Sequence, residues 1–269
     1  AIRQQTDGSF AAGGGRSDVG QTALALLPFL GEGHGSRTTG SEGRDVVAPG
    51  IAWIRRQLFP GGEPRAIEAA DLGIALKALS EDYMLSYGRL RPVEADRRAD
   101  ELTRLTARVV AAQEPSGAFP GADDDVRRAV WPMWGLEAAA RTGSVLPPAA
   151  VAERFRTWYG SRPRTANDDV AAGLLLARTF GDAFGRQALD DGTRRALAHG
   201  IDGEDDAFVL ATTGTGLLLH DARAFRDWSR GLDDKLIRSL LQTGVVRKGD
   251  PVGDTATVLL ALQVAYRTY

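Results

Sequence analysis

Acidic side chains are grouped at two places where they could act as proton donors. Ala122 is followed by Asp123, Asp124 and Asp125, and Glu204 precedes a second aspartate pair. Two neighbouring carboxyl groups can share the roles of acid and base, as in the cleavage of a glycosidic bond. The same side chains can instead cap helices, because their oxygens accept the free amides of a first turn. Capping is the interpretation that the sequence favours; in an enzyme, these four acids are our candidate catalytic residues.

A second set of candidates would meet only in the folded chain. Aspartates stand at or near the start of the apolar segments, where negative charge suits the helix dipole. If these segments are parallel helices in a ring, their N-termini form one acidic mouth, suited to a cation-bearing or hydroxylated ligand. The predicted ligand-binding residues are Asp18, Asp71, Asp169, Asp206 and Asp254, with Trp131 and Trp134 as cavity-lining or core aromatics.

Metal and cofactor chemistry find little support in the sequence. The chain has no cysteine and three histidines, none of them at ligand spacing from another. We therefore predict no metal site and no cofactor. The absence of cysteine is compatible with an extracytoplasmic location, but it assigns no compartment.

Composition narrows the possible partners. The 269 residues carry a formal net charge of −2 and are 43% hydrophobic. This charge balance gives no reason to expect a nucleic acid partner, and no apolar run approaches the roughly 20 residues of a membrane-spanning helix. Other protein subunits or an apolar small molecule remain open as partners.

The elements that must position these residues are helices of two alternating kinds. One kind is apolar nearly all round and must be buried on most sides; the other is amphipathic and charged. The apolar segments are Asp18–Phe29, Glu68–Ser80, Asp125–Ala140, Asp169–Thr179, Asp206–His220 and Gly253–Tyr266, and the amphipathic ones are Val46–Gln57, Val93–Gln113, Ala149–Tyr159, Ala183–His199 and Phe225–Gln242.

This alternation predicts an all-α fold of six helical hairpins, an (α/α)6 toroid with an inner apolar ring and an outer amphipathic ring. We expect one domain over residues 1–269, with Ala1–Gln5 as the end of a truncated first outer helix. An open solenoid is the alternative, although it would need a polar cap that the apolar C-terminal segment does not provide.

A short motif recurs where outer helices end. Gln4–Phe10 and Gln113–Phe119 both have Gln, then Gly four residues later, then Phe two further on, and Gln57 and Gly61 match in part. Gly permits the left-handed turn that ends a helix, and Gln can cap backbone groups of a neighbouring helix. With the C-terminal stretch Val252–Arg267, this motif resembles the prenyltransferase and squalene-cyclase repeat family, in particular a bacterial branch of it.

The resemblance implies the toroid fold, but the family's catalytic motifs are incomplete here. Cyclases of that family protonate an alkene through Asp-x-Asp-Asp, and Ala122 stands where the first aspartate is required. The zinc-binding members use a cysteine, which is absent. We therefore expect a non-catalytic binding or scaffold module of a larger assembly. The alternative is a diverged enzyme that uses the acids at the helix N-termini on an isoprenoid or a carbohydrate.

Overall fold

The structure is a computed structural model, and it describes residues 4–10, 18–40, 43–62, 67–162, 223, 225–231, 256 and 259. The chain divides into two compact units, one formed by Arg3–Ser161 and the other by Ala1–Ile2 with Arg162–Tyr269. Nearly all described residues belong to the first unit. In the second, residues 225–231 are helical, within a predicted amphipathic segment.

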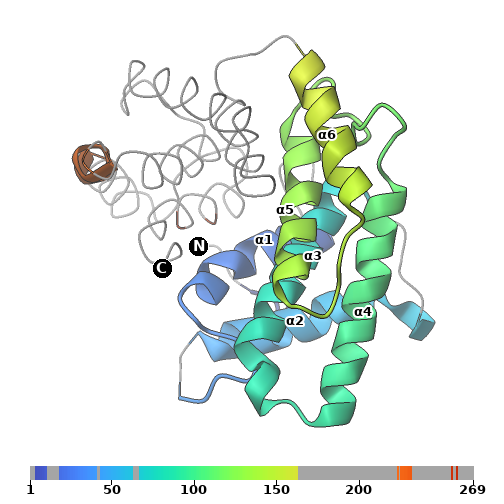
Figure 1. Cartoon of the computed structure of the whole chain (residues 1–269). Helices are drawn as coiled ribbons and strands as arrows, with labels where there is room; N and C mark the ends of the chain where they lie inside the picture. Colours follow the sequence, from blue (N-terminus) through green and yellow to red (C-terminus); the bar gives the residue numbers. More distant parts are fainter. Residues whose placement is uncertain are drawn as a thin grey trace. The chain divides into compact units, whose positions relative to one another are not determined.

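Six α-helices make up the described part of the first unit (Figure 1). They are α1 (Asp18–Gly31), α2 (Arg44–Leu58), α3 (Ala69–Ser86), α4 (Pro92–Ala111), α5 (Arg127–Arg141) and α6 (Ala149–Ser161), with two short 3-10 turns, η1 (Pro60–Gly62) and η2 (Tyr87–Arg89). Each matches a segment predicted from the sequence, and the described residues contain no strand. The predicted segments that begin at Asp169, Ala183, Asp206 and Gly253 lie almost wholly outside the described residues.

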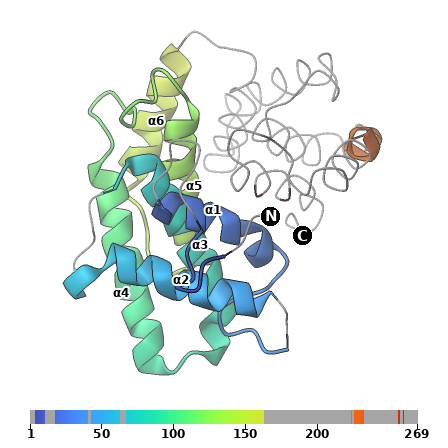
Figure 2. The same ribbon diagram turned by 180° about the vertical axis from the view of Figure 1, so that it is seen from behind.

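Helix α3 is the centre of this unit, as the two opposite views show (Figures 1 and 2). It contacts α1, α2, α4 and α5, and most of its side chains are buried. Helix α4, in contrast, buries only one side, which includes Leu102, Leu105 and Val109. Helix α3 packs mainly against the two other apolar helices, α5 and α1, and less against the amphipathic α4 and α2. This packing removes apolar side chains from water, which is the driving force for the arrangement.

Helices α1, α3 and α5 run parallel, with their N-termini at one end. Near their first turns, Gly20 of α1 lies against the Asp71 side chain of α3, and a Cβ on Gly73 would lie 2.5 Å from the Pro132 backbone of α5. Toward their other ends, the backbone N–H of Ser36, which follows α1, donates to Asp82 in the last part of α3 at 2.6 Å. The shared N-terminal end that we predicted is therefore present for the three described apolar helices.

In both full copies of the glutamine motif, the glutamine side chain ties its own loop to the start of the next outer helix. Gln113 Nε2 donates to the carbonyls of Gly117 (3.0 Å) and Val151 (2.9 Å), so it ties its own turn to the start of α6. Gln4 makes the equivalent two bonds to Gly8 and to Val46 of α2. Gly117 has φ +96°, which confirms the left-handed turn predicted for this position. The motif is a structural clamp.

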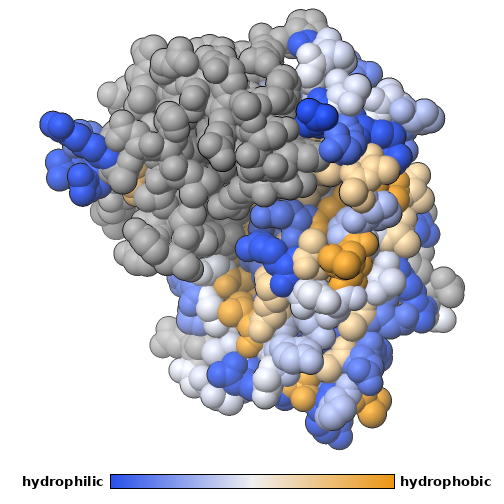
Figure 3. All heavy atoms as spheres, viewed as in Figure 1, coloured by the Kyte–Doolittle hydropathy of each residue, from blue (hydrophilic) through white to orange (hydrophobic). Residues whose placement is uncertain are grey.

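The surface of the described helices shows no single apolar face in the view of Figure 3, where small orange patches are separated by blue and white atoms. The large apolar side chains that are exposed among the described residues are Met84, Tyr87, Val93 and Leu146. None of the described helices is both long and apolar enough to cross a bilayer.

Candidate functional site

The three consecutive aspartates, Asp123, Asp124 and Asp125 (the acidic triad), lie in the turn that leads into α5, at the N-terminal end shared with α1 and α3. Asp123 and Asp124 are exposed and Asp125 is half-buried. The turn is closed by backbone bonds, among them one from the amide of Asp125 to the Gly121 carbonyl at 3.2 Å. All three carboxyl groups are thus held within one short, ordered segment that faces solvent.

Asp123 has a structural partner. Trp158 Nε1 of α6 donates to Asp123 Oδ1 at 3.0 Å. The first repeat contains the same kind of bond, since Trp53 Nε1 of α2 donates to Asp7 Oδ2 at 3.1 Å. Trp158 is seven residues after Val151, and Trp53 is seven residues after Val46; the carbonyls of these two valines accept the bonds from the motif glutamines. A bond between an outer-helix tryptophan and a loop aspartate therefore also occurs in the first repeat, which has no acidic triad. We conclude that this bond is a structural feature of the repeat.

The carboxyl groups of Asp125 and Asp124 differ in their hydrogen-bond and ion-pair partners. Asp125 Oδ1 accepts the backbone N–H of Arg127 at 3.0 Å and its Nε at 2.8 Å, so this carboxylate both caps α5 and pairs with a cation. Asp124 has no hydrogen bond or ion pair with any residue that the structure describes. Of the three acids, Asp124 is the one whose exposed carboxyl group is uncommitted within this part of the chain.

The remaining predicted acidic residues differ in position and in burial. Asp18 is exposed at the first residue of α1, at the same end as the triad. Asp71 is buried, with 4% of its surface exposed, and its side chain lies against Gly20, where a Cβ would collide with the carboxyl group. Asp71 thus joins α3 to α1. The other candidate acids, Asp169, Glu204, Asp206 and Asp254, lie outside the described residues.

The two candidate tryptophans are neighbours on α5. The ring centroids of Trp131 and Trp134 are 5.1 Å apart with an interplanar angle of 84°, an edge-to-face pair. Trp131 is 3% exposed and is therefore a core residue, whereas Trp134 is half-buried. Of the two, only Trp134 keeps an appreciable exposed surface.

A separate polar cluster lies toward the opposite end of α3. Asp82, 1% exposed, accepts a bond from Arg98 Nη1 of α4 at 2.8 Å and another from the Ser36 hydroxyl at 2.9 Å. Arg98 also pairs with Glu94, which Arg37 binds at 2.8 Å. These two guanidinium groups lower the pKa of Glu94 to about 2, with hydrogen bonding to Arg37 as the largest cause. Sequence reasoning missed this cluster, because its members come from three segments.

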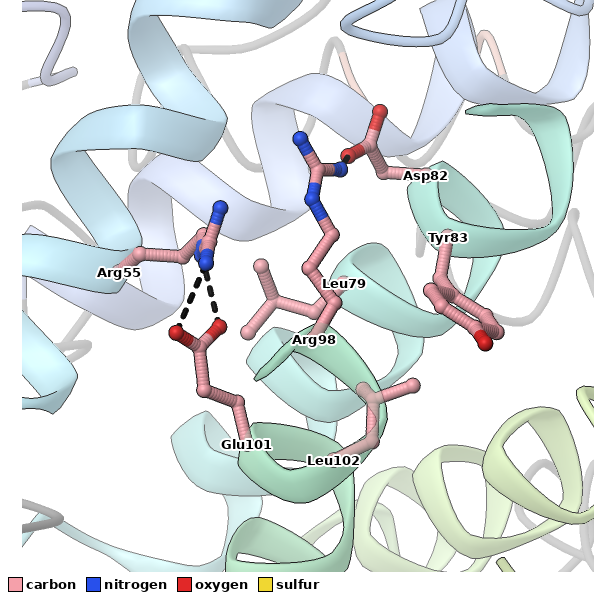
Figure 4. Close-up of a pocket in the computed structure, with 7 residues that line it drawn as sticks. All are labelled: Arg55, Leu79, Asp82, Tyr83, Arg98, Glu101 and Leu102. Atoms are coloured by element: carbon pink, nitrogen blue, oxygen red, sulfur yellow. Dashed lines mark hydrogen bonds and ion pairs between the residues drawn. The ribbon is translucent and has the colours of Figure 1, made fainter. Parts of the chain in front are cut away.

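A small cavity adjoins this cluster, as Figure 4 shows. Its volume is about 10 Å³, and its lining residues are Arg55, Leu79, Asp82, Tyr83, Arg98, Glu101 and Leu102. Arg55 binds Glu101 with both contacts at 2.7 Å, so most charges around the cavity are paired. A space of this size holds one water molecule at most. It is too small for the substrate of an enzyme, and the acidic triad remains the candidate site.

The described residues contain no group of three or more His, Asp or Glu side chains placed to hold a metal ion.

No protein-family model matches the sequence, and no curated protein matches it either. Solved structures do. The GH76A α-1,6-mannanase from Salegentibacter sp. HEL1_6 matches with a TM-score of 0.62 and 13% identity, over 98% of this chain and 95% of that chain. The fold is an α/α toroid.

Two inactive variants of the same mannanase match equally well, each with two adjacent aspartates replaced. The asparagine variant, in complex with α-1,6-mannotriose, has a TM-score of 0.61 at 12% identity over 98% of this chain and 95% of that chain. The alanine variant, in complex with α-1,6-mannotetrose, has a TM-score of 0.61 at 13% identity over 98% and 94%.

These matches confirm one prediction, narrow another and overturn a third. The all-α toroid of helical hairpins is confirmed as the fold class. The resemblance to the prenyltransferase and squalene-cyclase repeat family holds at the level of this fold only, since the similar structures are glycoside hydrolases. The expected non-catalytic scaffold is wrong: the matching toroids are mannanases, and they favour the carbohydrate alternative instead. The missing Asp-x-Asp-Asp motif excluded only one of the chemistries that a toroid can carry out.

Proposed function

We propose that this chain is a glycoside hydrolase that cleaves an α-1,6-linked mannan or a closely related polysaccharide. In this proposal Asp124 and Asp125 are the pair of catalytic carboxyl groups. The observation that carries it is the triad itself, adjacent aspartates on an ordered turn at the shared N-terminal end of α1, α3 and α5. The likeness in fold to a mannanase whose two adjacent aspartates are replaced in inactive variants supports the proposal.

The choice among the three acids follows from their contacts. Asp123 repeats a bond to an outer-helix tryptophan that Asp7 also makes, so its role is accounted for by the fold. Asp124 is exposed and uncommitted within the described residues, as a group that must meet a substrate should be. Asp125 follows it directly and is oriented by the two bonds from Arg127.

Glycoside hydrolysis needs two such groups. One carboxyl group donates a proton to the glycosidic oxygen as the bond breaks, and the other either activates water or attacks the anomeric carbon. We also propose that Asp18, which is exposed at the first residue of α1, contacts the sugar. We also propose that residues 1–269 form one catalytic domain, in line with the single domain predicted from the sequence.

The experiment is direct. The purified chain is incubated with α-1,6-mannotetrose and with longer α-1,6-mannan, and the products are separated by chromatography. We expect shorter oligosaccharides from the wild type and none from Asp124→Asn. A folded wild-type chain that leaves both substrates intact would refute the proposal.

A further inference from the structure

Arg98 of α4 has a buried hydrogen-bond donor that its ion pairs do not use. Its side chain is 9% exposed, and both terminal nitrogens are committed, since Nη1 donates to Asp82 at 2.8 Å and Nη2 to Glu94 at 2.9 Å. Its Nε is buried and has no hydrogen-bond partner among the residues that the structure describes. An unsatisfied buried donor on a charged group is costly, so native proteins almost always supply an acceptor, either from the protein or from ordered water.

The small cavity of Figure 4 lies beside this group. Arg98 is one of its lining residues, and its volume of about 10 Å³ is close to what one water molecule requires. Leu79 of α3 and Leu102 of α4 form its apolar walls. In Figure 4 the Arg55–Glu101 pair lies on one side of Leu79, and Arg98 lies on the other. A molecule in this space therefore has polar groups on both sides.

Glu101 supplies an acceptor on the same cavity. It stands three residues after Arg98 on α4, so the two side chains are neighbours on one side of the helix. The structure nevertheless shows no direct bond between them, because Glu101 binds Arg55 of α2, with both contacts at 2.7 Å. Each carboxylate oxygen has more than one acceptor position. Glu101 can therefore accept a further bond from a molecule that lies between it and Arg98.

The charges around the cavity favour a neutral occupant. Two arginines and two acidic residues line it, and each arginine binds one of the acids. An anion would be repelled by two carboxylates, and a cation by two guanidinium groups. A water molecule fits the volume, and it both accepts and donates hydrogen bonds, which is what the two sides of the cavity require.

We infer that this cavity binds one ordered water molecule, which accepts the Arg98 Nε–H bond and donates to Glu101. The water joins two ion pairs that share no direct bond. The first, Arg55–Glu101, connects α2 with α4. The second, Arg98–Asp82, connects α4 with α3, and Ser36 ties the loop after α1 to the same aspartate. One polar network then holds these four segments together, whatever the activity of the chain.

The direct test is a high-resolution crystal structure of the wild type and of two variants. In the wild type we expect one fully occupied water at about 2.7–3.2 Å from both Arg98 Nε and a Glu101 oxygen. Arg98→Lys keeps a cation for Asp82 but has a methylene group where arginine has Nε, so the water should be lost. The matched control is Arg37→Lys, which alters the same cluster at a residue that does not line the cavity, so the water should stay.

A measurement on the wild type in solution does not depend on the variants. In the nitrogen-15 spectrum of the arginine side chains, the Arg98 Nε–H should show a cross-peak to a long-lived water molecule, and it should exchange more slowly than that of the exposed Arg97. An ordered cavity without water density, or an Arg98 Nε–H without a water cross-peak, would overturn the inference. So would a water that stays at full occupancy in Arg98→Lys, or bromide that takes its place in a soaked crystal.

Discussion

The three adjacent aspartates offer the sharpest test, because the structure assigns each a different balance of stability and activity. We consider the single substitutions Asp123→Asn, Asp124→Asn and Asp125→Asn. Each removes one negative charge and keeps the shape of the side chain. The differences among them must then come from the contacts of each carboxyl group, and stability and activity can be measured independently.

The stability changes follow from the bonds lost. Asp124→Asn breaks no bond to a described residue, so the free energy of unfolding should stay within about 0.5 kcal/mol of the wild type. Asp125→Asn keeps a good cap for α5 but loses an ion pair whose side chains are 40% and 34% exposed, worth about 0.2–1 kcal/mol. Asp123→Asn keeps an acceptor for Trp158 and removes a charge, which should cost about 1 kcal/mol or less.

The activity changes should rank differently. Loss of a positioned general acid or base typically lowers kcat by about 10²- to 10⁴-fold, and we expect this for Asp124→Asn and Asp125→Asn. Asp123→Asn should stay within about threefold of the wild type. Urea denaturation gives the stabilities, and the release of reducing sugar from α-1,6-mannan gives the rates. A loss of activity in Asp123→Asn equal to that in Asp124→Asn, without unfolding, would refute our division of roles.

Three further predictions concern the scaffold. Gln113→Leu should destabilise the chain by about 2–4 kcal/mol and Gln4→Leu by about 1–2 kcal/mol in urea denaturation, because only the former also loses two bonds from Arg154; equal costs would contradict this. The pKa of Glu94 is about 2 in the folded chain, below its ordinary value of 4.5, so the stabilisation from this carboxylate is complete above pH 4.5 and is lost as the pH falls toward 2. With one arginine partner half exposed, this is about 2 kcal/mol, and the acid-unfolding curve of Glu94→Gln should lack it. Gly73→Ala places a Cβ 2.5 Å from the α5 backbone and should lower the thermal midpoint clearly, whereas Gly88→Ala, with open space around it, should not; similar midpoints would count against the close contact of α3 and α5.

Helix positions were predictable because the apolar and charged residues alternate with helical spacing. The exception is the end of α3, which we placed at Ser80 and which lies at Ser86. The sequence shows Glu81 and Asp82 as charges that interrupt an apolar run. In the folded chain Asp82 is buried, because Ser36 and Arg98, 46 and 16 residues away, bind it. Periodicity cannot reveal partners at such separations.

The composition and order of the residues alone determined the helical class, the alternation of buried and exposed helices, the glutamine clamp and the location of the acids, since these depend on neighbours in the chain. Which acid is left to meet a substrate was decided only by tertiary structure. Trp158 reaches Asp123 across 35 residues, and α3 and α5 pack closely because Gly73 and Gly135 lie at their contact. Interactions between distant segments depend on how helices are rotated and aligned, and that alignment is fixed by packing in three dimensions.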